Sequence, residues 1–345
     1  MEAYFRTKQP TKLQAALQFA DEKIGALNYE SALRALANKC NDVQLYDAAA
    51  KYFSKLVEQR KGNSNDSLLS KDYIGLSVAH SALGNLEPAL DAANAAVVVW
   101  GGGSEHRGEA LANLAKVVNA IRNGKLGNGL DGLVEYCDER AAKSGQYNYL
   151  LRKAIGNAYK DSEQYPLAIK QLQLAVELQP GDREIHESLI ACYDLADDKT
   201  SAARQLFELI KLYPREVKLY TQLGDRLGEK QLAAQYPSGK ERALTSMIEM
   251  LPTETEGHTQ LAKIRQEQNR WDDAILHWQR VAELRSKEPD GLLNLCRAYL
   301  HQQQRSEAQS AFKQLRRTVW PSRFDETLKS ELPKLQTKLG QIFSN

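Results

Sequence analysis

The sequence lacks the features that mark membrane-spanning and secreted proteins. No run of its 345 residues approaches 18 consecutive uncharged apolar residues. A membrane-spanning helix needs about 20 such residues. The first residues, MEAYFRTKQPTK, also lack the apolar core of a signal peptide. We therefore expect no membrane insertion and a cytoplasmic location.

The sequence also has little net charge. Its 46 Lys and Arg residues are balanced by 44 Asp and Glu residues, which gives a formal net charge of +2. Proteins that bind nucleic acid usually carry a clear basic excess. We therefore expect no nucleic-acid partner.

Cysteine is scarce and widely spaced. No CxxC pair occurs, so neither a zinc clip nor a redox motif can be written from neighbouring residues. Each cysteine lies in an apolar pattern typical of a helix, which predicts buried structural thiols. These cysteines are Cys40, Cys137, Cys192 and Cys296.

Catalytic and metal-binding motifs are absent as well. No two of the six histidines are four residues apart, and the HExxH, GxSxG and GxxxxGK[ST] motifs do not occur. The string GNGLDG matches a dinucleotide fingerprint, but it connects two predicted helices instead of following a strand. We expect His80 and His277 to be structural. The sequence therefore predicts a protein that is not an enzyme and has no cofactor, no metal ion and no small-molecule substrate.

What the sequence does contain is a repeat. Small, aromatic and apolar residues recur with a period of 34 residues, and the prolines Pro180 and Pro214 are separated by the same interval. Such a period is typical of stacked helical repeats. One set consists of Gly156, Tyr159, Ala168, Leu172 and Ala175, and the next set includes Tyr193, Ala202, Leu206 and Leu209.

These offsets resemble the tetratricopeptide repeat (TPR) family, whose unit is a pair of antiparallel helices. The resemblance covers most of residues 30 to 320. It implies an all-α fold, a right-handed α-solenoid of stacked antiparallel helix hairpins that forms a TPR-like superhelix. We expect eight hairpins. Units begin near Glu30, Ser70, Tyr149, Arg183, Val217, Thr255 and Pro289, with a further pair at about 104–122 and 130–143.

Spacing and turn residues predict how the chain is divided. Residues 1–29 form an N-terminal capping helix or partial repeat, 30–148 irregular TPR-like repeats, 149–320 regular repeats, and 321–345 a C-terminal capping helix that Pro333 would kink. A spacing of 38 residues marks an insertion around QYPSGK. Thr253 and Glu256 predict a capping box, Gly84 a helix end and Pro289 a helix start. Alanine at one second-helix position predicts close helix packing, at Ala49, Ala89, Ala168, Ala202, Ala274 and Ala308.

The resemblance implies that the chain is a non-catalytic protein-protein interaction scaffold, with a peptide or partner protein in the concave groove of the solenoid. An alternative is a regulatory or substrate-recruiting region of a larger enzyme or multidomain protein. The groove is expected to be lined by first helices, where acidic residues favour a basic peptide segment. The residues expected to line it are Lys153, Asn157, Glu184, Glu187, Asp194, Lys218, Asp225, Thr259, Lys263, Leu293 and Arg297.

Some members of this family hold a peptide's C-terminal carboxylates with two Lys, two Asn and one Arg. Lys153, Asn157 and Lys218 occupy three of those five places in this chain. Ser188 replaces the second Asn, and Gln222 replaces the Arg, whose planar fork suits a carboxylate. The match is therefore partial.

Overall fold

The computed structural model describes residues 10–27, 30–62, 66–99, 104–125, 129–144 and 148–343. All regular elements within these ranges are helices, and none of these residues lies in a strand. The prediction of an all-α protein is therefore confirmed. The chain divides into two packed units, Met1–Ala196 and Asp197–Asn345, which we describe separately and call unit 1 and unit 2.

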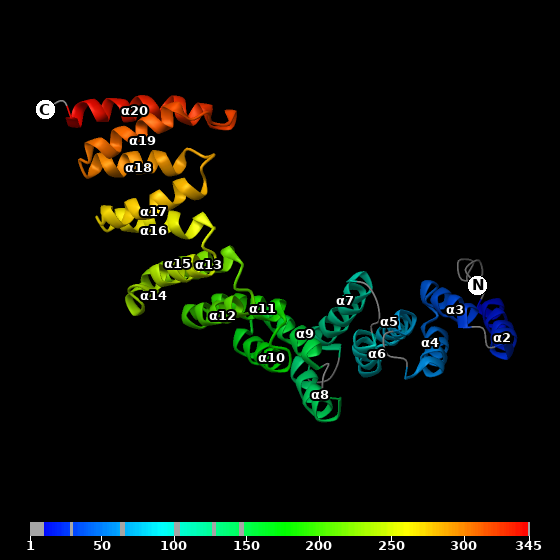
Figure 1. The fold of residues 1–345 in the computed structure, drawn as a ribbon. Helices are drawn as coiled ribbons and strands as arrows, with labels where there is room; N and C mark the ends of the chain where they lie inside the picture. The colour runs from blue at the N-terminus through cyan, green and yellow to red at the C-terminus, as the bar shows by residue number, and fades with distance from the viewer. Residues whose placement is uncertain are drawn as a thin grey trace. The chain divides into compact units, whose positions relative to one another are not determined.

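Unit 1 is a series of helices (Figure 1). The helices are α2 (Pro10–Leu27), α3 (Glu30–Asp42), α4 (Tyr46–Arg60), α5 (Ser67–Ala82), α6 (Leu86–Val98), α7 (Ser104–Ala120), the π-helix η1 (Ile121–Lys125), α8 (Gly129–Ser144), α9 (Asn148–Asp161), α10 (Tyr165–Leu178) and α11 (Arg183–Leu195).

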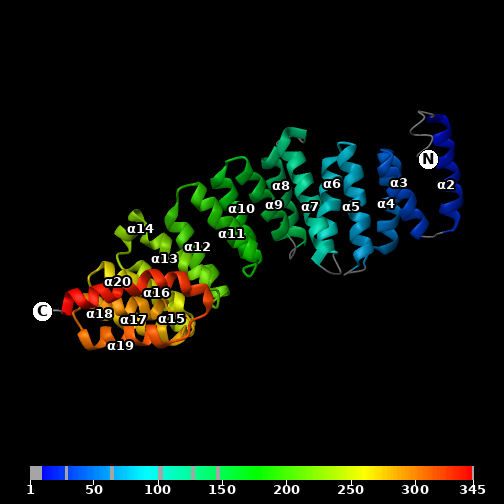
Figure 2. The ribbon, with the colours of Figure 1, turned by 90° about the horizontal axis from the view of Figure 1, so that it is seen from above.

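The helices of unit 1 pack in chain order. The pairs α3 and α4, α5 and α6, and α9 and α10 form hairpins, and each second helix also contacts the first helix of the next pair. Figures 1 and 2 show α3 to α6 side by side in this order. The helices α7 and α8 are joined through η1, which contacts both. Serial packing of this kind buries apolar faces that a single hairpin would leave exposed.

Unit 2 continues the same pattern of helices. Its elements are α12 (Lys199–Leu212), α13 (Val217–Gly228), α14 (Lys230–Gln235), α15 (Gly239–Met250), α16 (Thr255–Glu267), α17 (Trp271–Leu284), α18 (Asp290–His301), α19 (Arg305–Arg317), the 3-10 helix η3 (Ser322–Phe324) and α20 (Asp325–Phe343).

The predicted insertion and the last helix are both seen in unit 2. The QYPSGK segment runs from the last residue of the short helix α14 through a turn into the start of α15, and α13 and α15 pack together. Helix α20 packs on α18 and α19 and runs as one helix through Pro333. The predicted capping box is wrong, because α16 begins at Thr255 after Glu254 and has no side-chain cap.

The repeated alanines explain how closely the helices pack. All six predicted alanines are fully buried, in both units. A methyl group is the largest side chain that leaves room for a neighbouring helix at about 8 to 10 Å. Their complete burial agrees with the predicted close packing of helices at these positions.

The turns inside the hairpins share one backbone motif. A residue with positive φ follows the first helix at Gln44, Gly84, Glu163, Asn269 and Gln303. The amide of the next residue then donates to a carbonyl five residues earlier, as in Gln164 N to Tyr159 O at 2.9 Å. This is the Schellman arrangement, which satisfies carbonyls at a helix C-terminus. The prediction that Gly84 follows a helix end is confirmed.

Candidate functional site

The first helices of unit 1 form a continuous row. Successive first helices contact one another: α3 contacts α5, α5 contacts α7, α7 contacts α9, and α9 contacts α11. A row of this kind presents one side chain after another from successive repeats. It is the surface on which the sequence places the site residues of this unit.

An ion pair between two repeats uses a predicted site residue. Lys153 on α9 pairs with Glu184 on α11, and its Nζ lies 3.6 Å from Asp182 Oδ1. The hydrogen bond from Lys153 holds the pKa of Glu184 below its usual value. Side-chain exposure differs, at 13% for Lys153 and 73% for Glu184. The cation is therefore already neutralised by the chain's own carboxylates.

Helix α11 exposes acidic side chains on one face. Glu184, Glu187 and Asp194 are all exposed, and spacings of three and seven residues place them on the same side of the helix. Glu187 accepts a hydrogen bond of 2.7 Å from Arg183. On the neighbouring first helix, α9, Asn157 is half-buried.

The predicted site residues of unit 2 lie on three helices. Lys218 and Asp225 are exposed on α13, and Lys240 Nζ approaches Asp225 Oδ1 at 3.2 Å. On α16, Thr259 is half-buried and Lys263 is exposed.

The last repeat differs from the prediction. Leu293 on α18 is 3% exposed and belongs to the same buried cluster as Leu335 of α20, so it cannot line a binding surface. The first-helix position of Leu293 predicts a groove-lining residue, whereas its burial in this cluster makes it part of the core. Arg297 remains exposed and pairs with Glu331 of α20 at 2.5 Å.

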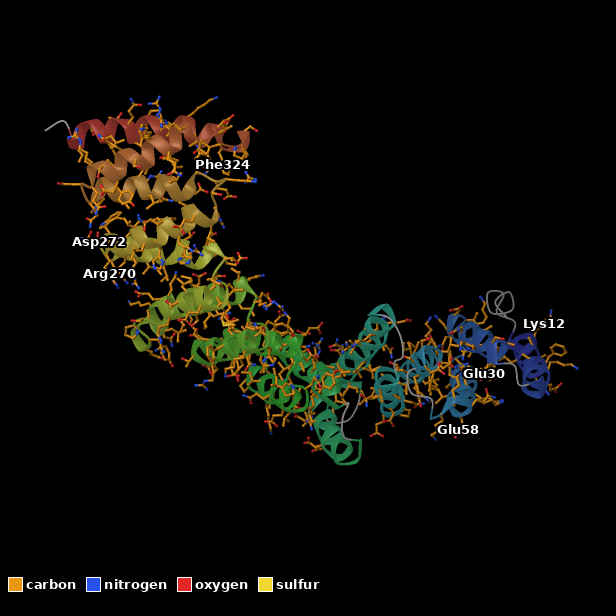
Figure 3. The ribbon with its side chains drawn as sticks, viewed as in Figure 1. Lys12, Glu30, Glu58, Arg270, Asp272 and Phe324 are labelled. Carbon is orange, nitrogen blue, oxygen red and sulfur yellow. The ribbon has the colours of Figure 1, made fainter. Side chains whose placement is uncertain are left out.

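Two polar clusters of the structure were not predicted from the sequence. In unit 1, Arg34 on α3 donates two hydrogen bonds of 2.6 Å to Asp72 on α5, whose side chain is fully buried. Burial raises the pKa of the Asp72 carboxyl, and the Arg34 guanidinium opposes that rise. Beside them, Arg60 donates to Glu30 at 2.7 Å, at the start of α3 (Figure 3). Separations of 30 and 38 residues hide these pairs in the sequence.

The second cluster is a histidine pair in unit 2. His258 on α16 and His277 on α17 face each other with 3.1 Å between their Nδ1 atoms. They are 19 residues apart, and only the antiparallel return of α17 brings them together. His277 thus packs against another histidine within its hairpin.

The remaining chemical features are structural or absent among the described residues. Cys40, Cys192 and Cys296 are buried thiols, and burial raises the pKa of Cys40 and Cys296 to about 11. The side chain of Cys137 lies outside the described residues. In the described part of the chain, no group of three or more His, Cys, Asp or Glu is placed to hold a metal ion. No helix there combines the length and apolarity needed to cross a bilayer.

Comparisons with known proteins gave similarity to solved structures alone. No protein-family model matches the chain, and no curated protein does. The C-terminal part of a TPR repeat-containing protein from Cytophaga hutchinsonii is 16% identical, with 82% of this chain and 93% of that chain covered and a TM-score of 0.38. The TPR2AB-domain:pHSP90 complex of yeast Sti1 is 15% identical, with 92% and 99% covered and a TM-score of 0.29.

A third solved structure, MamA 41-end from Desulfovibrio magneticus RS-1, is 21% identical, with 55% of this chain and 97% of that chain covered and a TM-score of 0.31. Three features of this chain indicate a helical repeat. The 34-residue period, the six buried alanines and the serial packing of helix hairpins within each unit agree with one another. This chain is built from helical hairpins packed in series, the arrangement that the resemblance to the tetratricopeptide repeat predicts.

Proposed function

We propose that the chain is a non-catalytic scaffold that binds a peptide or partner protein along the exposed face of its first helices. The observation that carries this proposal is the row of first helices in unit 1, in which successive helices contact one another and project side chains from successive repeats. A row of helices offers a partner many weak contacts in a fixed order.

The charges on this face favour a basic partner segment. Helix α11 presents Glu184, Glu187 and Asp194 on one side, and complementary charge accelerates association and excludes partners of the same sign. The expected contact is a Lys- or Arg-rich segment laid across α9 and α11.

The same geometry argues against a partner held by its C-terminal carboxylate. Lys153 occupies one of the three matching places of that binding mode, but Asp182 and Glu184 of the next repeat surround its ammonium group. A peptide carboxylate would have to displace Glu184 and would meet repulsion from Asp182. The absence of Arg at position 222 adds to this cost.

The experiment that tests the proposal starts from affinity purification and mass spectrometry to identify a partner. Its affinity is then measured by calorimetry for the wild type and for Glu187→Lys. Reversing this charge is expected to weaken binding by about tenfold or more. The matched control is Glu177→Lys, which makes the same substitution at an exposed residue of α10, a second helix of unit 1.

For unit 2, Lys263→Glu on α16 and Lys313→Glu on α19 form an equivalent pair of variants. A change of affinity confined to the first-helix variants, with a loss in Glu187→Lys, supports the proposal. Equal affinity in all four variants would show that the partner binds elsewhere, and a partner whose contact segment is acidic would contradict the expected charge.

A further inference from the structure

The histidine pair of unit 2 brings two ring nitrogens within hydrogen-bonding distance of each other. His258 and His277 direct their Nδ1 atoms at each other across the α16–α17 hairpin, with 3.1 Å between the nitrogens and 5.3 Å between the ring centroids. Only one of these nitrogens can carry a proton if the other is to accept it. Both rings are half-buried, so solvent reaches the pair.

The distance between the nitrogens suits two ligands of one metal ion. Histidine nitrogens bind zinc at about 2.0 to 2.1 Å, and neighbouring ligands subtend about 90 to 109° at the metal. These values place the two nitrogens about 2.8 to 3.4 Å apart, a range that includes 3.1 Å. An ion bound by both nitrogens would therefore leave their separation unchanged.

The surroundings determine which ions would bind. Burial lowers the pKa of both histidines, so both rings are neutral ligands at pH 7. Arg265 of α16 and Arg280 and Asp273 of α17 are the charged groups that act on the pair. Among the described residues no acidic cluster accompanies the rings, which disfavours Ca²⁺ and Mg²⁺ because these ions need oxygen ligands.

We infer that His258 and His277 form a two-histidine site for a divalent late transition-metal ion, with its other positions open to solvent or to a ligand. Both Nδ1 atoms bind the ion, and the proton of the donating Nδ1 moves through solvent to Nε2 of the same ring. Both imidazoles stay neutral, and no proton is released. Imidazole suits copper, nickel and zinc, and Cu²⁺ is expected to bind most tightly.

The test is a calorimetric titration of the full chain, without a histidine tag, with CuCl2 and ZnCl2 in a non-chelating buffer at pH 7. The variants are His258→Gln and His277→Gln, because glutamine keeps polarity and a similar length. His301→Gln on α18 is the matched control, since His301 is exposed and stacks on Trp271 instead of facing a second histidine. Circular dichroism checks that each variant folds.

We expect one Cu²⁺ per chain, binding at least about tenfold weaker in His258→Gln and in His277→Gln, and unchanged binding in His301→Gln. Equal affinity in all four proteins, or no binding by the wild type, would overturn the inference. Electron paramagnetic resonance of the wild type with one equivalent of Cu²⁺ provides a test that needs no variant. Coupling to two imidazole nitrogens supports the site, and a spectrum without nitrogen coupling refutes it.

Discussion

The first and last repeats of the chain are held together by different chemistry. Between α3 and α5 of unit 1, the buried contact includes an ion pair, Arg34 with the fully buried Asp72. Across α17 to α20 of unit 2, the core cluster is apolar and includes Trp278, Phe312 and Leu335. The same repeat pattern therefore accommodates a buried ion pair beside the apolar cluster of α3 to α5, and a cluster of apolar side chains across α17 to α20.

This difference shows what the repeat specifies. The period fixes where helices meet and where small residues are needed, but it leaves open how the contact is stabilised. An apolar contact gains free energy from burial alone. A buried ion pair has to recover the desolvation of two charges, so it adds little net stability while making the loss of either partner costly.

The largest effect is expected at the apolar end. Trp278→Ala removes a side chain that is 2% exposed and should lower the free energy of unfolding by about 3 to 5 kcal/mol. Urea denaturation followed by circular dichroism measures the change. Leu276→Ala, two residues away but 64% exposed, is the control and should change stability by less than about 0.5 kcal/mol. Similar losses in both variants would mean that the cluster is not the core of unit 2.

The next largest effect is expected at the charged end. Asp72→Asn leaves the Arg34 guanidinium without its counter-charge and should cost about 3 kcal/mol in the same urea experiment. Combining Arg34→Met with Asp72→Leu replaces the pair with apolar groups. That double variant should be more stable than Asp72→Asn and would convert the contact to the kind found in unit 2. A double variant less stable than the single one would mean that the ion pair itself determines how α3 and α5 pack.

The smallest effect is expected at two ion pairs between helices in which one partner is exposed, one pair in each unit. Glu184→Gln in unit 1 and Glu331→Gln in unit 2 should each cost no more than about 1 kcal/mol at pH 7. Lys153 lowers the pKa of Glu184, and Lys334 and Arg297 lower the pKa of Glu331.

The pH dependence of these two variants has a definite sign. The unfolded chain binds a proton at a glutamate at about pH 4.3, above the pKa of the same group in the folded chain. The stabilisation by each glutamate is therefore present above about pH 4.3 and is lost as the pH falls through the lower, folded value. Thermal melts at pH 7 and at pH 3 should show a difference from wild type only at pH 7. A difference that persists at pH 3 would point to packing and not to charge.

Much of the fold could be predicted because the repeat depends on local constraints. An alanine such as Ala168 or Ala274 is needed wherever two helices approach closely, so its position can be read from spacing alone. The insertion around QYPSGK could also be located, because it changes a 34-residue interval to 38. This segment forms the turn between α14 and α15.

The polar contacts could not be predicted, because they join residues that only packing brings together. In the sequence, Asp72 is an ordinary acidic residue of a helix, and only the packing of α3 on α5 brings Arg34 next to it. The repeat position of Leu293 predicts a surface residue, but its apolar side chain is buried in the cluster that also contains Leu335 of α20. The ion pairs of Lys153, a predicted site residue, could not be predicted either, because its acidic partners come from the following repeat.

The turns have a practical consequence. Where a single left-handed residue, such as Glu163 or Gln303, closes a hairpin, adding even one residue would misdirect the returning helix. The hairpin of α13 and α15 is closed by α14 instead, and its two long helices still pack together. Residues 229–238 are therefore the place to insert a tag or a sensor peptide, because the connection between α13 and α15 already contains the additional helix α14.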